Sequence, residues 1–244
     1  MLDILPSQAT TINSSFREVH RRAREDNVEW LARNLPGDVQ QTAVVMVGGT
    51  EPCHFRLRVA QSHARHDLTP SHWSHVFVVG RSHKKIGGTR IWEIALDPIS
   101  GFGFPPPSKG VQEARLGRYT DPKLFPNVAV FRLSVSLRDV RDAIDRFACQ
   151  RAVLDAPEHI LVWLAYLWGA GASPNPLLED RGIPAAAMLE TVLAAAGCEL
   201  TPNLPSRSSC PEALWQTARW WHLYFEADSR NPLEGSWSVN NRRP

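Results

Sequence analysis

Short runs of apolar, mostly β-branched residues alternate with glycine-rich or polar segments in the first half of the chain. The run at 41–49 ends on two glycines, and a second run at 74–81 is followed directly by a third that contains the letters WEIA. Runs of this length and composition, bounded by glycine, predict β-strands. We therefore expect a strand at 41–49, a hairpin over 74–97 with its turn near 84–88, and another strand at 127–135.

Apolar residues at helical spacing dominate the rest of the chain. Before the first strand, residues 13–34 carry such a pattern behind a serine that can cap a helix. In the second half, the segments end at glycine or begin near proline, which is typical of helix boundaries. A helix is expected within each of the segments 136–150, 156–171, 183–200 and 206–225. The pattern as a whole predicts an α+β fold in which a small antiparallel sheet packs against helices.

The length of the chain fits one large domain or two small ones. Of its 244 residues, 43% are hydrophobic, which is enough for a packed core. We expect a helical extension at 1–36, the main domain at 37–228 and a loosely held tail at 229–244. Glycine and proline crowd residues 98–127, so we expect this segment to form a long excursion or a lid over the site.

Charge and cysteine content narrow the class of protein. A formal charge of +2 without a long basic run gives no surface for tracking phosphates, so nucleic acid is not an expected partner. No stretch of about 18 apolar residues predicts a membrane span, and the N-terminus lacks the apolar core of a secretory signal. We therefore expect a cytoplasmic protein whose four widely spaced cysteines stay free thiols.

Neither a metal nor an organic cofactor is expected. The chain has no CxxC pair that would suggest zinc. His63, His66, His72 and His75 lie close in sequence, but no cysteines or paired carboxylates accompany them at ligand spacing. A polar loop therefore explains this group better than a metal cluster does.

A cysteine stands where the last helix should begin. Ser209 and Glu212 have the spacing of a capping box, and Pro211 is tolerated in a first turn, so a helix is expected to start at or beside Cys210. Unpaired N–H groups and the positive end of the helix dipole favour a thiolate there, and the same groups can hold an oxyanion. Cys210 is therefore a candidate nucleophile, although free cysteines are also often buried for packing alone.

Two strand residues are candidates for a base and for the group that orients it. His75 opens the strand of the SHV motif, and Glu93 lies in the next strand. Each residue also has a purely structural interpretation. His75 can be a half-buried histidine that is hydrogen-bonded to a carbonyl group, and Glu93 can be a carboxylate that faces solvent. His72 is a further candidate in place of Glu93. The adjacent Cys53 and His54 match a nucleophile and a base by type, but neighbours on an extended chain point to opposite faces.

The order of these motifs resembles that of the circularly permuted NlpC/P60 hydrolases, papain-like proteins related to the YiiX-like and lecithin:retinol acyltransferase-like groups. In such chains a Gly-Asp pair opens the first strand, here GDVQQTAVVMVGG, and an SHV strand follows. A second strand carries a polar residue in an E-A pattern, here WEIA, and a final helix opens with cysteine and an acidic residue, here CPEAL. The resemblance covers roughly residues 37–225.

The resemblance implies a permuted papain-like fold and a cysteine-dependent hydrolase or acyltransferase. Such an enzyme cleaves an amide or ester bond through a covalent acyl-enzyme, so peptides, amides or acyl esters are the implied substrates. Carried over to this chain, Cys210 is the nucleophile, His75 is the general base and Glu93 orients the imidazole. Phe77 and Pro211 depart from the small residue after SHV and the polar residue after the cysteine that such chains usually have.

Two other functions stay open. A catalytically inactive relative would keep the fold and bind a partner through the cleft or the Trp-rich end, and Phe77 and Pro211 favour it. The chain could also be an effector or toxin-type protease of a defence or toxin (conflict) system, in which the same cysteine acts only after an activating event. The N-terminal helix is a candidate contact surface for a protein partner. Trp215, Trp220 and Trp221 are expected to pack the last helix into the core.

Overall fold

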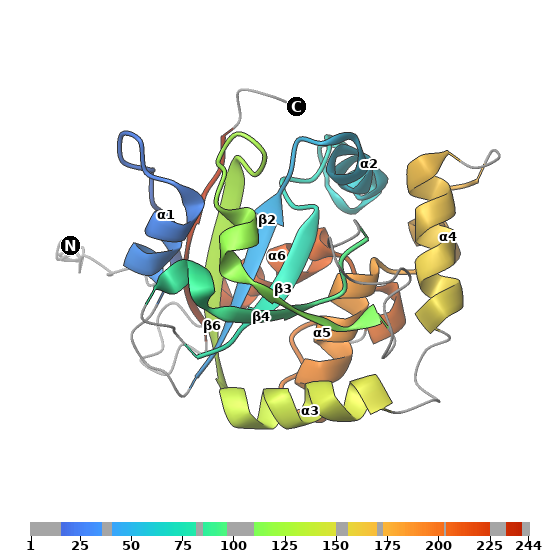
Figure 1. Cartoon of the computed structure of the whole chain (residues 1–244). Helices are drawn as coiled ribbons and strands as arrows, with labels where there is room; N and C mark the ends of the chain where they lie inside the picture. The colour runs from blue at the N-terminus through green and yellow to red at the C-terminus, as the bar shows by residue number, and fades with distance from the viewer. Residues whose placement is uncertain are drawn as a thin grey trace, which may run out of the picture.

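The computed structural model describes most of the chain. The described residues are 16–35, 41–81, 85–96, 110–149, 156–169, 173–202, 204–224 and 233–240. They form a seven-stranded mixed sheet that packs against helices, as Figure 1 shows. The expected α+β class is confirmed, with a sheet larger than expected.

The sheet is built around three apolar strands. In chain order, its strands are β1 (Phe16–Glu18), β2 (Gln41–Gly48), β3 (His75–Val79), β4 (Arg90–Glu93), β5 (Gln112–Arg115), β6 (Asn127–Ser136) and β7 (Leu233–Ser238). Their order across the sheet is β1-β7-β6-β2-β3-β4-β5. The pairings are antiparallel except that of β1 with β7, which is parallel. The strands expected near 41–49, 74–97 and 127–135 are therefore all present.

Helices and short turns cover the sheet. The helices are α1 (Asn27–Asn34), α2 (Pro52–Ala60), α3 (Leu137–Cys149), α4 (Ala156–Trp168), α5 (Pro184–Ala195) and α6 (Pro211–Tyr224). A 3₁₀ turn at Leu116–Tyr119 adds two buried residues to the packing. In Figure 1, α6 crosses behind β2 and β3, and α3 runs along one end of the strands.

Both faces of the central strands are buried, in two separate cores. Val44 and Met46 of β2 pack on the side of α3, α5 and α6. Val45 and Val47 of the same strand pack on the side of α1 and the Leu116–Tyr119 turn. Successive side chains of a strand point to opposite faces, so a strand that is covered on both sides reads as one continuous apolar run. This explains why β2, β3 and β6 are visible in the sequence.

Both chain ends differ from the sequence-based expectation. The helix expected over 13–34 is confined to Asn27–Asn34, and Phe16–Glu18 forms β1 instead. The tail expected from residue 229 contains β7, which pairs with β6 inside the sheet. Residues 16–18 and 233–238 therefore belong to the sheet, and the ring of Phe16 packs against Trp215 of α6 and Trp237 of β7, at centroid distances of 5.4 and 4.8 Å.

Gly235 makes this edge of the sheet possible. A Cβ atom at this position would lie 2.5 Å from the carbonyl oxygen of Val130 and 2.7 Å from the Phe16 ring. We expect Gly235→Ala to lower the free energy of unfolding by about 1 to 3 kcal/mol, because the added methyl group overpacks a closed site. Urea denaturation followed by circular dichroism measures this. Ser236→Ala on the same strand is the control, and an equal effect of both substitutions would contradict the packing described here.

Of two segments between the strands, one was not predicted and the other needs correction. Residues 52–60, which show no clean periodicity, form α2, whose inward-facing positions include the buried polar residues His54 and Arg58 beside Leu57 and Ala60. Part of the segment 98–127, which was expected to be a lid, instead forms strand β5 and the Leu116–Tyr119 turn. Its residues 98–109 lie outside the described part of the chain.

Candidate functional site

The structure brings His75 and Glu93 together. They lie on the neighbouring antiparallel strands β3 and β4, and Nε2 of His75 is 2.7 Å from Oε2 of Glu93. The two residues are 5% and 0% exposed. The sequence thus identified a real contact, but it lies in the interior rather than at an open cleft.

Glu93 is the centre of a buried network. The hydroxyl group of Tyr119 donates a hydrogen bond of 2.5 Å to Oε2, and Nη1 of Arg118 lies 3.3 Å from Oε1. A buried carboxylate is tolerated when hydrogen bonds and a cation compensate it, and here three side chains do so. The solvent-facing alternative for Glu93 is therefore wrong.

Cys210 lies at the N-terminus of α6, as the sequence indicates. The backbone N–H of Leu214 donates to the Cys210 carbonyl oxygen at 3.1 Å, which makes Cys210 the residue that opens the helix. Its side chain is only 4% exposed. Burial raises the pKa of the thiol to about 11, although hydrogen bonds from the backbone N–H groups of Ala213 and Glu212 act in the opposite direction. The expected thiolate is therefore not favoured, because the desolvation penalty exceeds the effect of the helix end.

The sheet separates Cys210 from His75. The imidazole ring lies 6.0 Å from the ring of Phe77 and 5.8 Å from that of Tyr119, both of which belong to the core on the α1 side. Cys210 belongs to the core on the other side, together with Val76. Since adjacent strand residues point to opposite faces, the thiol and the imidazole cannot share a proton in this arrangement. The predicted nucleophile and base are not brought together.

Glu212, the acidic residue after the cysteine, has a structural role. It is fully buried, and its carboxylate accepts hydrogen bonds from Ser71 at 2.6 Å and Gln216 at 2.6 Å, with Arg65 at 3.4 Å. Its backbone N–H donates to the side-chain oxygen of Gln61 at 2.8 Å. These contacts hold the start of α6 to the segment that joins α2 to β3.

The expected capping box is not formed. The carboxylate of Glu212 bonds to Ser71, Gln216 and Arg65 rather than to the backbone of Ser209. Among the described residues, the buried hydroxyl group of Ser209 has no hydrogen-bond partner. The spacing of a capping box was present, but long-range partners compete for the same groups.

The other candidates lie apart from the His75–Glu93 pair. His72 is half-buried, and its pKa is lowered mainly by burial and also by the charge of Arg65, whereas the charge of Glu212 raises it. It therefore lies near Glu212 and does not replace Glu93. Nδ1 of His54 is 3.0 Å from the hydroxyl group of Ser74, so His54 contacts the residue that precedes β3. In the described residues, no group of three potential ligands could hold a metal ion.

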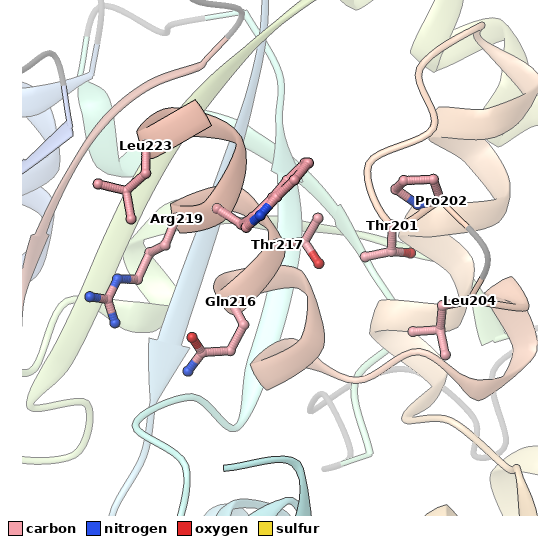
Figure 2. A pocket seen from close by; sticks show the side chains of 8 residues that line it. Thr201, Pro202, Leu204, Gln216, Thr217, Arg219 and Leu223 are labelled. Atoms are coloured by element: carbon pink, nitrogen blue, oxygen red, sulfur yellow. The ribbon is translucent and has the colours of Figure 1, made fainter. Parts of the chain in front are cut away.

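A surface groove on α6 was not predicted from the sequence. It has a volume of about 590 Å³ and lies between the outer surface of α6 and the segment before it. It is lined by Thr201, Pro202, Leu204, Gln216, Thr217, Arg219, Trp220 and Leu223. Figure 2 shows Thr217 on α6 turned toward Thr201 on the neighbouring segment. Four apolar and four polar residues therefore line this open groove.

The Trp-rich helix is only partly a core element. Trp215 is 4% exposed, as expected, but Trp220 is 51% exposed. The indole N–H of Trp221 donates to the Leu200 carbonyl oxygen at 2.8 Å. Trp220 and Leu223 are three positions apart, which places them on one helix face, whereas Leu214 and Ala218 form the buried face. The spacing of Trp220 and Leu223 in the sequence could therefore have predicted this second apolar face of the helix.

Comparison of the chain with family models, with curated proteins and with solved structures gave no match. Within the described residues, no helix combines the length and the apolar character that crossing a membrane requires. The function therefore has to be argued from the geometry of the sites themselves.

Proposed function

We propose that this chain is a non-catalytic binding module in which the residues that match the papain-like catalytic positions stabilise the fold. The observation that carries the proposal is that the Cys210 side chain is buried and is separated from His75. Burial of the Cys210 side chain, which is 4% exposed, raises the pKa of its thiol to about 11 and so disfavours the thiolate at pH 7, and the sheet lies between that thiol and His75. A thiol without solvent access or a base is a poor nucleophile.

The geometry of the His75–Glu93 pair supports the same proposal. Glu93 already accepts from His75 and Tyr119, and Arg118 balances its charge. The imidazole is packed against Phe77 and is 5% exposed. A general base has to reach a substrate proton, and this ring is almost entirely buried. The pair instead ties β3 and β4 to the Leu116–Tyr119 turn.

Cysteine alkylation tests the proposal. We expect iodoacetamide at pH 8 to 9 to modify the exposed Cys149 and to leave Cys210 unmodified until the protein unfolds, because Cys149 is open to solvent and Cys210 is covered. Mass spectrometry of digested protein measures each site. Cys149 is the internal control for reagent activity. Modification of Cys210 as the fastest site, with an apparent pKa below about 8.5 that rises in His75→Asn, would overturn the proposal.

A second candidate is the cysteine hydrolase or acyltransferase that the resemblance implies, including its effector or toxin-type form. The observation that favours it is that the backbone N–H of Ala213 faces the Cys210 sulfur. A donor in that position would stabilise a thiolate and an oxyanion once the thiol is uncovered. Under this candidate we propose His72, which senses the charge of Glu212, as the base in place of His75.

A reactive acyl probe separates the two candidates. Under the second candidate, a thiol-directed probe such as an acyloxymethyl ketone labels Cys210, and His72→Gln abolishes the labelling while circular dichroism stays unchanged. Under the first, Cys210 is labelled no faster in the native chain than in His72→Gln. The result therefore decides between binding and catalysis.

A further inference from the structure

The outer face of α6 carries an ordered apolar surface. The side chains of Trp220 and Leu223 are 51% and 62% exposed, and Leu204 across the groove is 37% exposed. The Trp220 ring stacks on that of Tyr224 with a centroid distance of 5.2 Å and an interplanar angle of 20°. Large side chains held in fixed positions lose little conformational entropy on binding, so this surface suits recognition.

Hydrogen bonds fix both walls of the groove. Trp221 of α6 donates to the Leu200 carbonyl oxygen at 2.8 Å, which sets the spacing between the helix and the segment beside it. Thr201 donates to the buried carboxylate of Glu190 at 2.6 Å. The polar residue Gln216 is held by its hydrogen bond to Glu212. The groove is therefore preformed, and its volume of about 590 Å³ lies in the usual range for ligand sites.

The charge of the groove selects its occupant. Arg219 is the one charged residue among those that line it, and it forms no ion pair with another residue in the part of the chain that the structure describes. Figure 2 shows its side chain extending from α6 on the side away from Pro202. A guanidinium group beside an apolar wall recognises a carboxylate next to an apolar side chain. A second copy docking by the same face would bring no exposed carboxylate of the groove to Arg219.

We propose that this groove binds a peptide segment of a partner protein in which a bulky apolar side chain stands beside an aspartate or glutamate. The apolar side chain lies against Trp220 and Leu223, and the carboxylate pairs with Arg219. The inference rests on the proposed binding function, but its site is independent of Cys210. Its failure is therefore distinguishable from the failure of the proposed function.

A random 12-residue peptide library displayed on phage and selected on the full chain tests the inference. We expect enriched peptides to share an acidic residue beside a bulky apolar one. Fluorescence anisotropy with the enriched peptides should show that Arg219→Glu and Trp220→Ala each weaken binding by about tenfold or more. Arg138→Glu on α3 and Leu161→Ala on α4 are the matched controls, since both residues are exposed and lie on other helices.

A charge exchange makes the test specific. A peptide in which lysine replaces the acidic residue should bind Arg219→Glu better than it binds the native chain, which a merely structural role of Arg219 would not produce. Enrichment of no peptide, or of peptides that bind Arg219→Glu as tightly as the native chain, would overturn the inference. Sedimentation velocity measures whether the chain forms a dimer. A dimer that Trp220→Ala dissociates would overturn the inference and assign the surface to self-association.

Discussion

Glu93→Ala is expected to lower the free energy of unfolding by about 3 to 5 kcal/mol, which is the usual cost of removing one partner from a buried charge pair. The substitution leaves the Nε2 atom of His75, the hydroxyl group of Tyr119 and the guanidinium group of Arg118 without their common acceptor. Because His75 and Tyr119 are buried, solvation does not make up their loss, whereas the Arg118 side chain is 20% exposed and is partly solvated.

Urea denaturation of the full chain measures the effect of Glu93→Ala. Glu113→Ala is the matched control, because Glu113 lies on the adjacent strand β5 and forms an exposed ion pair with Arg90. We expect this control to lose about 0 to 1 kcal/mol. Tyr119→Phe, which removes one donor, should fall between the two. Equal losses for Glu93→Ala and Glu113→Ala would contradict the buried network.

Glu212→Ala is expected to lower the free energy of unfolding by about 3 kcal/mol, because Arg65 and Ser71 lose a fully buried acceptor. It should also speed hydrogen exchange in the first turn of α6, since Glu212 holds that turn to the α2–β3 segment. Cys210, which opens the helix, should then become more accessible to alkylation.

Denaturation, hydrogen exchange and alkylation are measured on the same Glu212→Ala protein. Glu158→Ala on α4 is the control, since Glu158 forms a largely exposed ion pair with Arg181. We expect little change in any of the three measurements for the control. If Glu212→Ala loses stability but the first turn of α6 exchanges at the native rate, the anchoring role assigned to Glu212 is wrong.

The central strands were predictable because burial on both faces gives β2, β3 and β6 continuous apolar sequences. The edge strands β1 and β5 were not, because they are three and four residues long and largely polar on one or both faces. Their place in the sheet depends on partners far away in the chain. The same holds for α2, where His54 and Arg58 fill buried positions that periodicity assigns to apolar residues.

The candidate site was predictable only in part. Residue type and strand order were enough to bring Glu93 to His75, because the two strands form a short hairpin. Strand alternation also shows that His75 and Val76 face opposite sides. Both sides of β3 are apolar, so the sequence pattern does not reveal which core receives α6 and Cys210. That choice is made by distant contacts, such as those of Glu212 with Ser71 and Arg65.

The ionisation of Cys210 tests the central claim most directly. The ¹³Cβ chemical shift of this residue, followed by NMR against pH in selectively labelled protein, reports the thiol-to-thiolate change without a reagent. The account predicts that the Cys210 thiol titrates with a pKa of about 11 and that this pKa is the same in His75→Asn. A titration with a pKa below about 8.5 that moves upward in His75→Asn would contradict the account, because it would require the thiol and the imidazole to interact.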